Sequence, residues 1–195
     1  VPVSLTYEVQ PDSFTLRVRG SVQAQGPAYL LVDLPQTLAI TERDTADHFT
    51  QLSFAWKPVA RSAQGEKFSE LDPGERRLVA DSLAWAVAKS KYFLVGVLAP
   101  KGGRPLAELA MDGGVRKAKL ATRARGTLVV PVANGGAAFD VYAGPQEWRR
   151  LAAQGRGFED ANPYGGWFQG LIQPFSTMAI RAILWLHDNL RLGYG

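Results

Sequence analysis

Alternating apolar and polar residues dominate the first two-thirds of the chain. In the segment 3–10, apolar residues occupy every second position and polar residues fill the positions between them. A period of two is typical of an antiparallel strand that buries one face and exposes the other. The same alternation resumes after the turn residues Pro11-Asp12-Ser13. The opening of the chain therefore predicts a β-hairpin with half-buried strands.

Further strands are predicted along the chain, separated by turns rich in Gly, Pro, Asp and Asn. The predicted strand segments are 28–34, 37–40, 49–57, 83–99, 104–111, 114–124, 126–133 and 137–142, and turns are expected at 25–27, 72–74, 101–103, 112–114 and 134–136. The segment 83–99 is apolar at successive positions, so we expect one long central strand buried on both faces. Many short strands with such turns predict an all-β antiparallel sandwich or barrel.

Two helices are predicted near the end of the chain. The first spans 145–153, because Pro145 suits a first helical turn and Gly155 suits the position after the last one. The second lies within 174–190 and is amphipathic when successive residues are placed about 100° apart. Its polar side carries Gln173, Thr177, Arg181 and Asp188, and its apolar side carries Leu171, Phe175, Met178, Ala182, Trp185, Leu186 and Leu190.

These elements divide the chain into three parts: a β-sandwich in 1–143, a short helix and linker in 144–165, and an amphipathic helix in 166–195. Polar residues interrupt the last part, whereas a membrane-spanning helix needs about 20 predominantly apolar residues. Tryptophan favours the membrane–water interface, so we expect this helix to lie on a bilayer or on protein. Docking on the sandwich core is the alternative. The candidates for membrane contact are Trp167, Phe168, Phe175, Met178, Trp185 and Leu186.

The net charge of +4 is concentrated in one stretch, because seven basic and only two acidic residues lie between Lys101 and Gly126. Its second half supplies candidates for contact with lipid headgroups or a partner, namely Arg116, Lys117, Lys119, Arg123 and Arg125. A solvated strand face is the alternative. The stretch lacks the interleaved aromatic residues that stack on single-stranded nucleic acid, so we expect no nucleic-acid partner.

The sequence offers little chemistry for catalysis. It has no cysteine, which excludes a disulfide, a thiolate nucleophile and a cysteine zinc site. The two histidines, His48 and His187, are far apart, and no Gly-x-Ser-x-Gly or phosphate-loop motif is present. Asp44, Asp47 and His48 form a polar cluster that we interpret as an exposed loop. We therefore expect no catalytic residue, no metal and no cofactor.

Motifs near the end of the chain resemble a known family. They are FDVYAGPQEW at 139–148, YGGWF at 164–168, IQPF at 172–175 and ILWLH at 183–187, and upstream WAVAKSKYFL at 85–94. Their order and spacing resemble the junction between the first periplasmic domain and the second transmembrane helix of bacterial YidC membrane protein insertases. The resemblance covers about residues 80–195.

The resemblance implies a periplasmic β-supersandwich, similar in fold to galactose mutarotase, on the outer side of the bacterial inner membrane. It further implies SecDF-type accessory subunits of the Sec translocon and nascent membrane proteins as partners, and a supporting, non-catalytic role beside a transmembrane bundle that this chain lacks. Arg181, in the predicted interfacial helix, is not the basic residue of that bundle's groove. Two alternatives are a carbohydrate-binding or carbohydrate-converting sandwich with Trp56 and Trp85 in its cleft, and a lipid-surface adaptor that salt would release.

Overall fold

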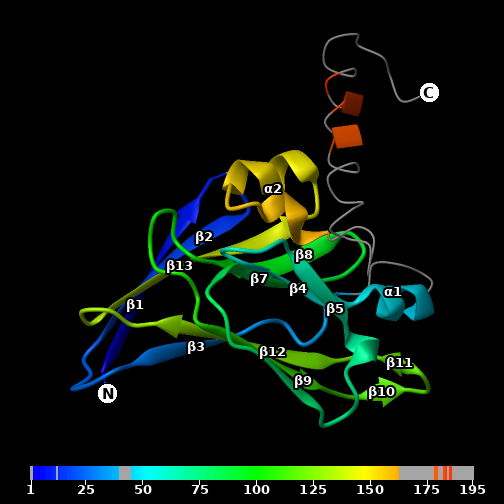
Figure 1. The fold of residues 1–195 in the computed structure, drawn as a ribbon, viewed down its shortest axis with the longest axis horizontal. Coiled ribbons are helices and arrows are strands. Elements are labelled where there is room, and N and C mark those ends of the chain that lie inside the picture. Colours follow the sequence, from blue (N-terminus) through cyan, green and yellow to red (C-terminus); the bar gives the residue numbers. More distant parts are fainter. Residues whose placement is uncertain are drawn as a thin grey trace. The chain divides into compact units, whose positions relative to one another are not determined.

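A computed structural model of the chain describes residues 2–11, 13–39 and 45–162, together with 178, 179, 182, 183 and 185. The chain divides into two compact units, Val1–Ala161 and Asn162–Gly195. The first unit contains a seven-stranded sheet, called here the larger sheet, a four-stranded sheet, called the smaller sheet, and a separate pair of very short strands. Figure 1 shows the two main sheets stacked on each other.

The larger sheet is antiparallel throughout. Its spatial order is β1 (Val3–Gln10), β2 (Thr15–Val22), β13 (Gly136–Pro145), β8 (Phe93–Leu98), β7 (Leu83–Lys89), β4 (Ser53–Pro58) and β5 (Gln64–Lys67). The predicted opening hairpin is confirmed, because β1 and β2 pair from Val3 opposite Val22 to Gln10 opposite Thr15.

The smaller sheet is also antiparallel. Its order is β3 (Tyr29–Asp33), β12 (Ala124–Pro131), β9 (Glu108–Gly113) and β6 (Arg76–Val79). Side chains from both sheets meet in one buried core, for example Phe54 and Phe139 from the larger sheet and Leu109 and Leu128 from the smaller one. The expected class, an all-β antiparallel sandwich, is confirmed.

A second core lies on the other face of the larger sheet. Trp85 and Tyr142 project there from β7 and β13, and the rings of both make edge contacts with Phe158, at centroid distances of 5.4 and 5.5 Å. Phe158 belongs to the short helical turn η2 (Phe158–Ala161), which follows helix α2 (Trp148–Gln154). In Figure 1, α2 covers this face of the sheet. The central strands are therefore buried on both faces.

The predicted long strand 83–99 is instead two strands, β7 and β8, which pair with each other. The chain turns at Ser90-Lys91-Tyr92, and the backbone N–H of Ser90 donates to the carbonyl of Phe93 at 2.9 Å. Burial on both faces is confirmed, since Trp85 and Ala86, which point to opposite faces, are both buried. Both faces of these strands carry apolar residues, so the sequence does not alternate between apolar and polar positions there. Only the short polar turn indicated that the chain changes direction.

Other predicted strands also differ from the structure. Residues 37–39 form no strand, and helix α1 (Thr45–Gln51) occupies the start of the predicted strand 49–57. The segment 114–124 contains only β10 (Arg116–Lys117) and β11 (Leu120–Ala121), apart from Ala124 at the start of β12. His48 lies in α1 and is only 4% exposed, so the interpretation of its cluster as an exposed loop is wrong. Tertiary packing buries one side of this short helix.

The helix predicted at 145–153 is present but begins three residues later, at Trp148. Pro145 is still the last residue of β13 and lies opposite Phe93, and Glu147 is the N-terminal cap. The predicted C-terminal stop is confirmed, because Gly155 has a φ of 69°, in the left-handed region that glycine enters without a Cβ clash. One further element is the helical turn η1 (Phe68–Glu70).

The turn predicted at 112–114 is wrong, because Asp112 and Gly113 end strand β9. Gly113 is required there by a close backbone approach: a Cβ on it would lie 1.9 Å from the carbonyl oxygen of Asp72. The loop is held by backbone hydrogen bonds, from Gly113 to the carbonyl of Glu75 at 2.8 Å and from Gly74 to the carbonyl of Gly113 at 3.0 Å.

We expect Gly113→Ala to lower the free energy of unfolding by about 2 to 3 kcal/mol, because the loop backbone must move to admit the methyl group. Urea denaturation measures the change. Gly26→Ala is the matched control, since nothing lies within 4 Å of its added Cβ. That variant should stay within about 0.5 kcal/mol of the parent. Equal stability of the two variants would contradict the close approach.

Candidate interaction surfaces

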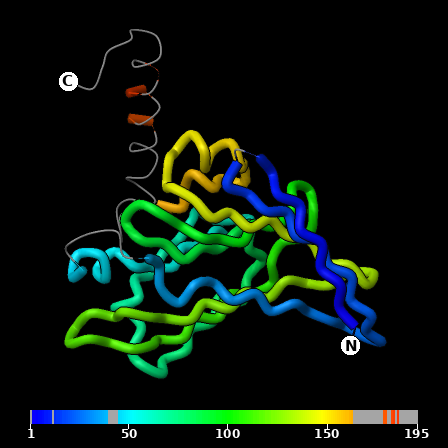
Figure 2. Tube along the Cα trace, turned by 180° about the vertical axis from the view of Figure 1, so that it is seen from behind, coloured from blue at the N-terminus to red at the C-terminus, as the bar shows by residue number. Residues whose placement is uncertain are grey.

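Strand β1 lies at the margin of the larger sheet (Figure 2). It is exposed on both faces. Its apolar residues Val3, Leu5, Tyr7 and Val9 lie opposite the β2 residues that face the sandwich core, and they are 43 to 76% exposed. The prediction that this strand buries one face is therefore wrong. The larger sheet has seven strands and the smaller sheet has four, so the smaller sheet does not cover the margin of the larger sheet at β1. We call these four residues the β1 row.

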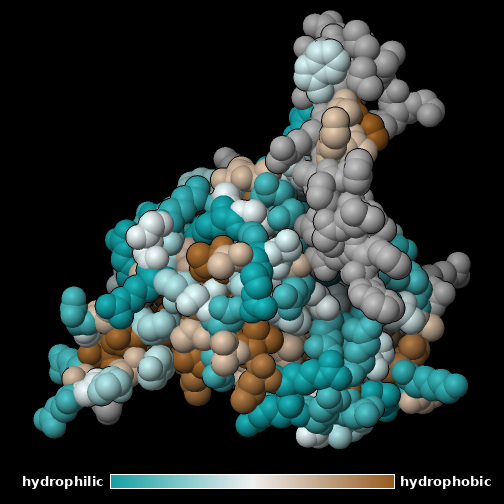
Figure 3. Space-filling view, viewed as in Figure 1, coloured by the Kyte–Doolittle hydropathy of each residue, from teal (hydrophilic) through white to brown (hydrophobic). Residues whose placement is uncertain are grey.

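Two features of the β1 row suit the binding of an extended chain, namely exposed apolar side chains and an unpaired strand edge. Figure 3 shows apolar side chains gathered on the left of the molecule, in the region of β1 and β3 in Figure 1. Tyr29 and Leu31 of β3 are also exposed, on the outer side of their sheet. β1 pairs with β2 along one edge, and no strand of the described chain pairs with its other edge. Such an edge offers backbone donors and acceptors to a further strand.

The five predicted basic contact residues lie around the short β10–β11 pair and the start of β12. Arg116 has a structural role, because its Nη2 donates to the carbonyl of Leu71 at 2.9 Å and to Oδ1 of Asp72 at 2.8 Å. Lys117, Lys119, Arg123 and Arg125 are exposed. The structure thus brings four basic side chains to the surface here and holds the fifth against the loop that precedes β6.

A neighbouring carboxylate reduces the positive charge of this surface. Arg125 lies opposite Asp112, and the guanidinium of Arg76 donates to both oxygens of Asp112, at 2.6 and 3.1 Å. The hydrogen bond from Arg76 lowers the pKa of Asp112, and the charge of Arg125 contributes to the same shift. Asp112 is therefore ionised at neutral pH and partly balances the basic side chains.

In the second unit, the described residues after Asn162 are helical and exposed. Met178 and Trp185 are 71% and 61% exposed, and their spacing of seven residues, with Ala182 between them, places them on one side of a helix. The other predicted contact residues, Trp167, Phe168, Phe175 and Leu186, lie outside the described residues. Within the described chain, no helix is both long and apolar enough to cross a membrane.

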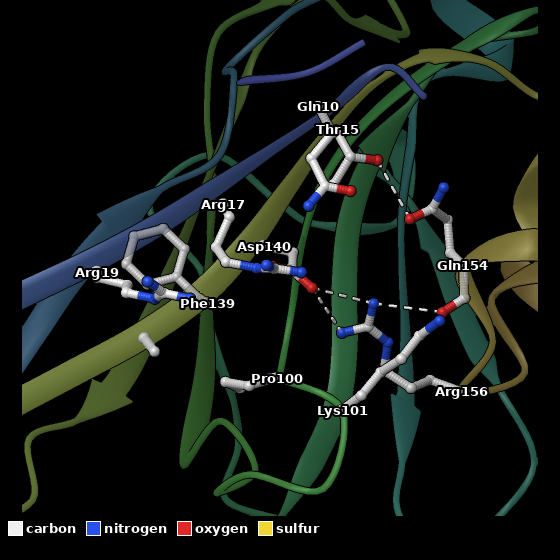
Figure 4. A pocket seen from close by; sticks show the side chains of 11 residues that line it. Gln10, Thr15, Arg17, Arg19, Pro100, Lys101, Phe139, Asp140, Gln154 and Arg156 are labelled. Carbon is white, nitrogen blue, oxygen red and sulfur yellow. Dashed lines mark hydrogen bonds and ion pairs between the residues drawn. The ribbon is translucent and has the colours of Figure 1, made fainter. Parts of the chain in front are cut away.

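A polar cavity of about 250 Å³ opens on the outer face of the larger sheet, beside the end of α2. We call it the Arg156 pocket (Figure 4). It is lined by Gln10, Thr15, Arg17, Arg19, Pro100, Lys101, Ala138, Phe139, Asp140, Gln154 and Arg156. At its base, both terminal nitrogens of Arg156 donate to Oδ2 of Asp140, at 3.1 and 3.2 Å, and Arg17 approaches Oδ1 at 3.5 Å.

Arg156 also joins the turn after α2 to the larger sheet. Its guanidinium donates to the carbonyls of Ala99 and Gln154, and its own carbonyl accepts from the indole N–H of Trp85 at 3.2 Å. The residue has a φ of 63°, which is uncommon for a residue with a Cβ. Sequence reasoning missed this pocket, because its residues come from distant segments and share no motif. The only local signal was the Gly155-Arg156-Gly157 turn.

Among the described residues, the structure forms neither the carbohydrate cleft of the alternative interpretation nor a metal site. Trp56 and Trp85, which would line a carbohydrate cleft in the alternative interpretation, are buried in the two cores. In the part of the chain that the structure describes, no three His, Asp or Glu side chains come together as metal ligands would.

Comparison with known proteins agrees with the fold. A family model described as the YidC periplasmic domain matches residues 1–178. The membrane protein insertase YidC of Anaeromyxobacter sp. (strain K) is 30% identical over 134 residues, which cover 67% of this chain and 22% of that protein. The corresponding insertase of Syntrophus aciditrophicus (strain SB) is 22% identical over 133 residues, covering 68% of this chain and 23% of that protein. The match thus spans less than a quarter of either relative. Because the family match takes in both sheets of the sandwich and α2, this chain belongs to the YidC periplasmic domain family.

Proposed function

We propose that this chain is the periplasmic part of a bacterial inner-membrane protein insertase, and that it supports the insertion and folding of membrane proteins by contacting their extended segments. The relatives described above are membrane protein insertases, which supports the general role. The observation that carries the contact is the β1 row, an exposed apolar face on an edge strand. No catalytic step is part of the proposal.

The β1 row suits an apolar segment that has not yet reached the bilayer. Such a segment can add to the free edge of β1 as a strand, so that backbone hydrogen bonds supply affinity without reading sequence. Alternate side chains of the added strand then pack beside Val3, Leu5, Tyr7 and Val9, which lie on one face of β1. Partial burial of each is worth on the order of 1 kcal/mol, before the cost of ordering the segment. Contact of this strength is transient, as release to the membrane requires.

The terminal segment is proposed to hold the sandwich at the membrane surface. Met178 and Trp185 are exposed on one side of a helix, and tryptophan prefers the wet edge of a bilayer. The exposed Lys117, Lys119, Arg123 and Arg125 are available to anionic headgroups, each worth about 1 kcal/mol when close to the surface. SecDF-type subunits of the translocon are the alternative partners for these surfaces.

Site-specific photo-crosslinking tests the role of the β1 row. A photoreactive residue replaces Tyr7 in the intact insertase that contains this domain, during synthesis of an inner-membrane protein. We expect crosslinks to the nascent chain at Tyr7 and several-fold fewer at Thr6, the adjacent residue on the opposite face of the same strand. Crosslinks only to a SecDF-type subunit would assign the row to that partner. Equal yields at both positions, or none, would contradict the proposal.

A further inference from the structure

We propose that the Arg156 pocket binds a phosphate group, carried either by a phospholipid headgroup or by a soluble phosphate ester. This site lies on the outer face of the larger sheet, whereas the β1 row follows the opposite face. The inference therefore does not rest on the proposed function. It rests on the charge of the pocket, on a buried donor without a partner, and on the size of the cavity.

Positive charge in the pocket exceeds the negative charge that balances it. Among the described residues, four cationic side chains line the cavity, Arg17, Arg19, Lys101 and Arg156, against the single carboxylate of Asp140. One more carboxylate, Glu8, lies beside the cavity and approaches Arg17 and Arg19 only at 3.8 and 4.0 Å. An anion would complete this arrangement, because clustered cations raise the local concentration of anions and hold them by charge-assisted hydrogen bonds.

The role of the ion pair at the base is to fix the cations in place. Figure 4 shows Arg17 and Arg156 reaching Asp140 from opposite sides. Asp140 is buried, so its charge is already committed to these two residues. Arg19 and Lys101, nearer the opening, are exposed. Lys101 makes no hydrogen bond or ion pair with any residue in the described chain, although it lines the cavity.

One buried polar group of the pocket also lacks a partner among the described residues. The Nε of Arg156 is buried and makes no hydrogen bond within the described chain. Beside it, the hydroxyl of Thr15 and the side-chain amide of Gln154 form a hydrogen bond at 3.1 Å. A buried donor without an acceptor is costly, and a phosphate supplies several strong acceptors at once.

The size and geometry of the pocket favour a phosphate. A volume of about 250 Å³ is many times the volume that one buried water needs, enough for a phosphate and a few attached atoms. Guanidinium groups match phosphate oxygens in pairs, and an ammonium adds a point charge. The pocket offers three guanidinium groups and one ammonium.

Titration of the whole 195-residue chain with glycerol 3-phosphate, followed by NMR, tests the site. The double variant Arg19→Gln with Lys101→Gln removes two exposed cations and keeps the Arg156–Asp140 pair. We expect it to weaken binding about tenfold. The matched control, Arg61→Gln with Lys67→Gln, removes the same charge from two exposed residues that do not line the cavity and should leave binding unchanged. Equal weakening in both double variants, or no binding by the parent chain, would overturn the proposal.

Flotation with vesicles distinguishes the two sources of the phosphate. The vesicles contain phosphatidylcholine with or without phosphatidylglycerol. If the pocket variant loses both glycerol 3-phosphate and the phosphatidylglycerol-dependent part of vesicle binding, the ligand is a lipid headgroup. If it loses only glycerol 3-phosphate, the ligand is a soluble ester. The photo-crosslinking result at Tyr7 is independent of both, so failure of either proposal is recognised separately.

Discussion

Replacing Arg156 by alanine is expected to lower the free energy of unfolding of the sandwich by about 3 to 5 kcal/mol. The side chains of Arg156 and Asp140 are only 11% and 10% exposed, so their charges depend on each other. Without Arg156, the buried carboxylate keeps only Arg17 among the described residues, at 3.5 Å, and the carbonyl of Ala99 loses its donor. The φ of 63° is equally unfavourable for alanine, so the change reports the side chain. Urea denaturation followed by tryptophan fluorescence measures it.

Arg150→Ala is the control for this experiment. Arg150 forms an ion pair with Glu147 at the start of α2, but those two side chains are 45% and 51% exposed. Exposed pairs contribute about 0 to 1 kcal/mol, so we expect a small change. If Arg156→Ala cost no more than Arg150→Ala, the buried pair would not be what holds the turn after α2 to the sheet. The double variant Arg156→Met with Asp140→Leu should recover part of the loss, because no buried charge is left without a partner.

Replacing Phe175 and Trp185 together by aspartate should abolish the association of the chain with liposomes. Both residues lie on the apolar side of the predicted amphipathic helix, and Trp185 is helical and 61% exposed in the structure. Each loses an aromatic surface worth roughly 1.5 to 3 kcal/mol on full burial and gains a charge, so the partition coefficient should fall about 100-fold or more. Flotation in a density gradient measures the bound fraction.

Gln173→Asp with Thr177→Asp is the matched control, since it adds the same two charges to the polar side of the predicted helix. We expect this variant to float nearly as well as the parent chain. Unchanged flotation of the Phe175→Asp, Trp185→Asp variant would refute membrane positioning by the segment. Equal losses in both variants would mean that net charge alone governs binding, with no amphipathic side.

Local patterns predicted those features of the fold that depend on neighbouring residues. The turn at 134–136 is one example: Asn134 and Gly135 have φ values of 51° and 71°, as a two-residue hairpin turn between twisted strands requires. The β1–β2 hairpin and the end of α2 at Gly155 followed from alternation and from glycine chemistry. Family membership was equally accessible, because the motifs at 139–187 are contiguous in the sequence.

Burial was predicted less well, because it depends on what lies opposite a residue. The alternation in β1 is that of a half-buried strand, yet its place at the margin of the wider sheet leaves Val9 76% exposed. His48 shows the reverse, since it lies in a polar local sequence and is nevertheless buried. Neither outcome is encoded in the pattern of the segment itself.

The sequence by itself determined the class of fold, several turns, the family and the amphipathic character of the terminal segment, since each depends on residues close together along the chain. Only the tertiary structure decided which strand is left at the margin and which charges meet. Arg17, Asp140 and Arg156 lie far apart in the sequence and come together because β2 pairs with β13 and the turn after α2 folds back over both. Interactions across such distances leave no period in the sequence, because they depend on strand order and register rather than on local conformational preference.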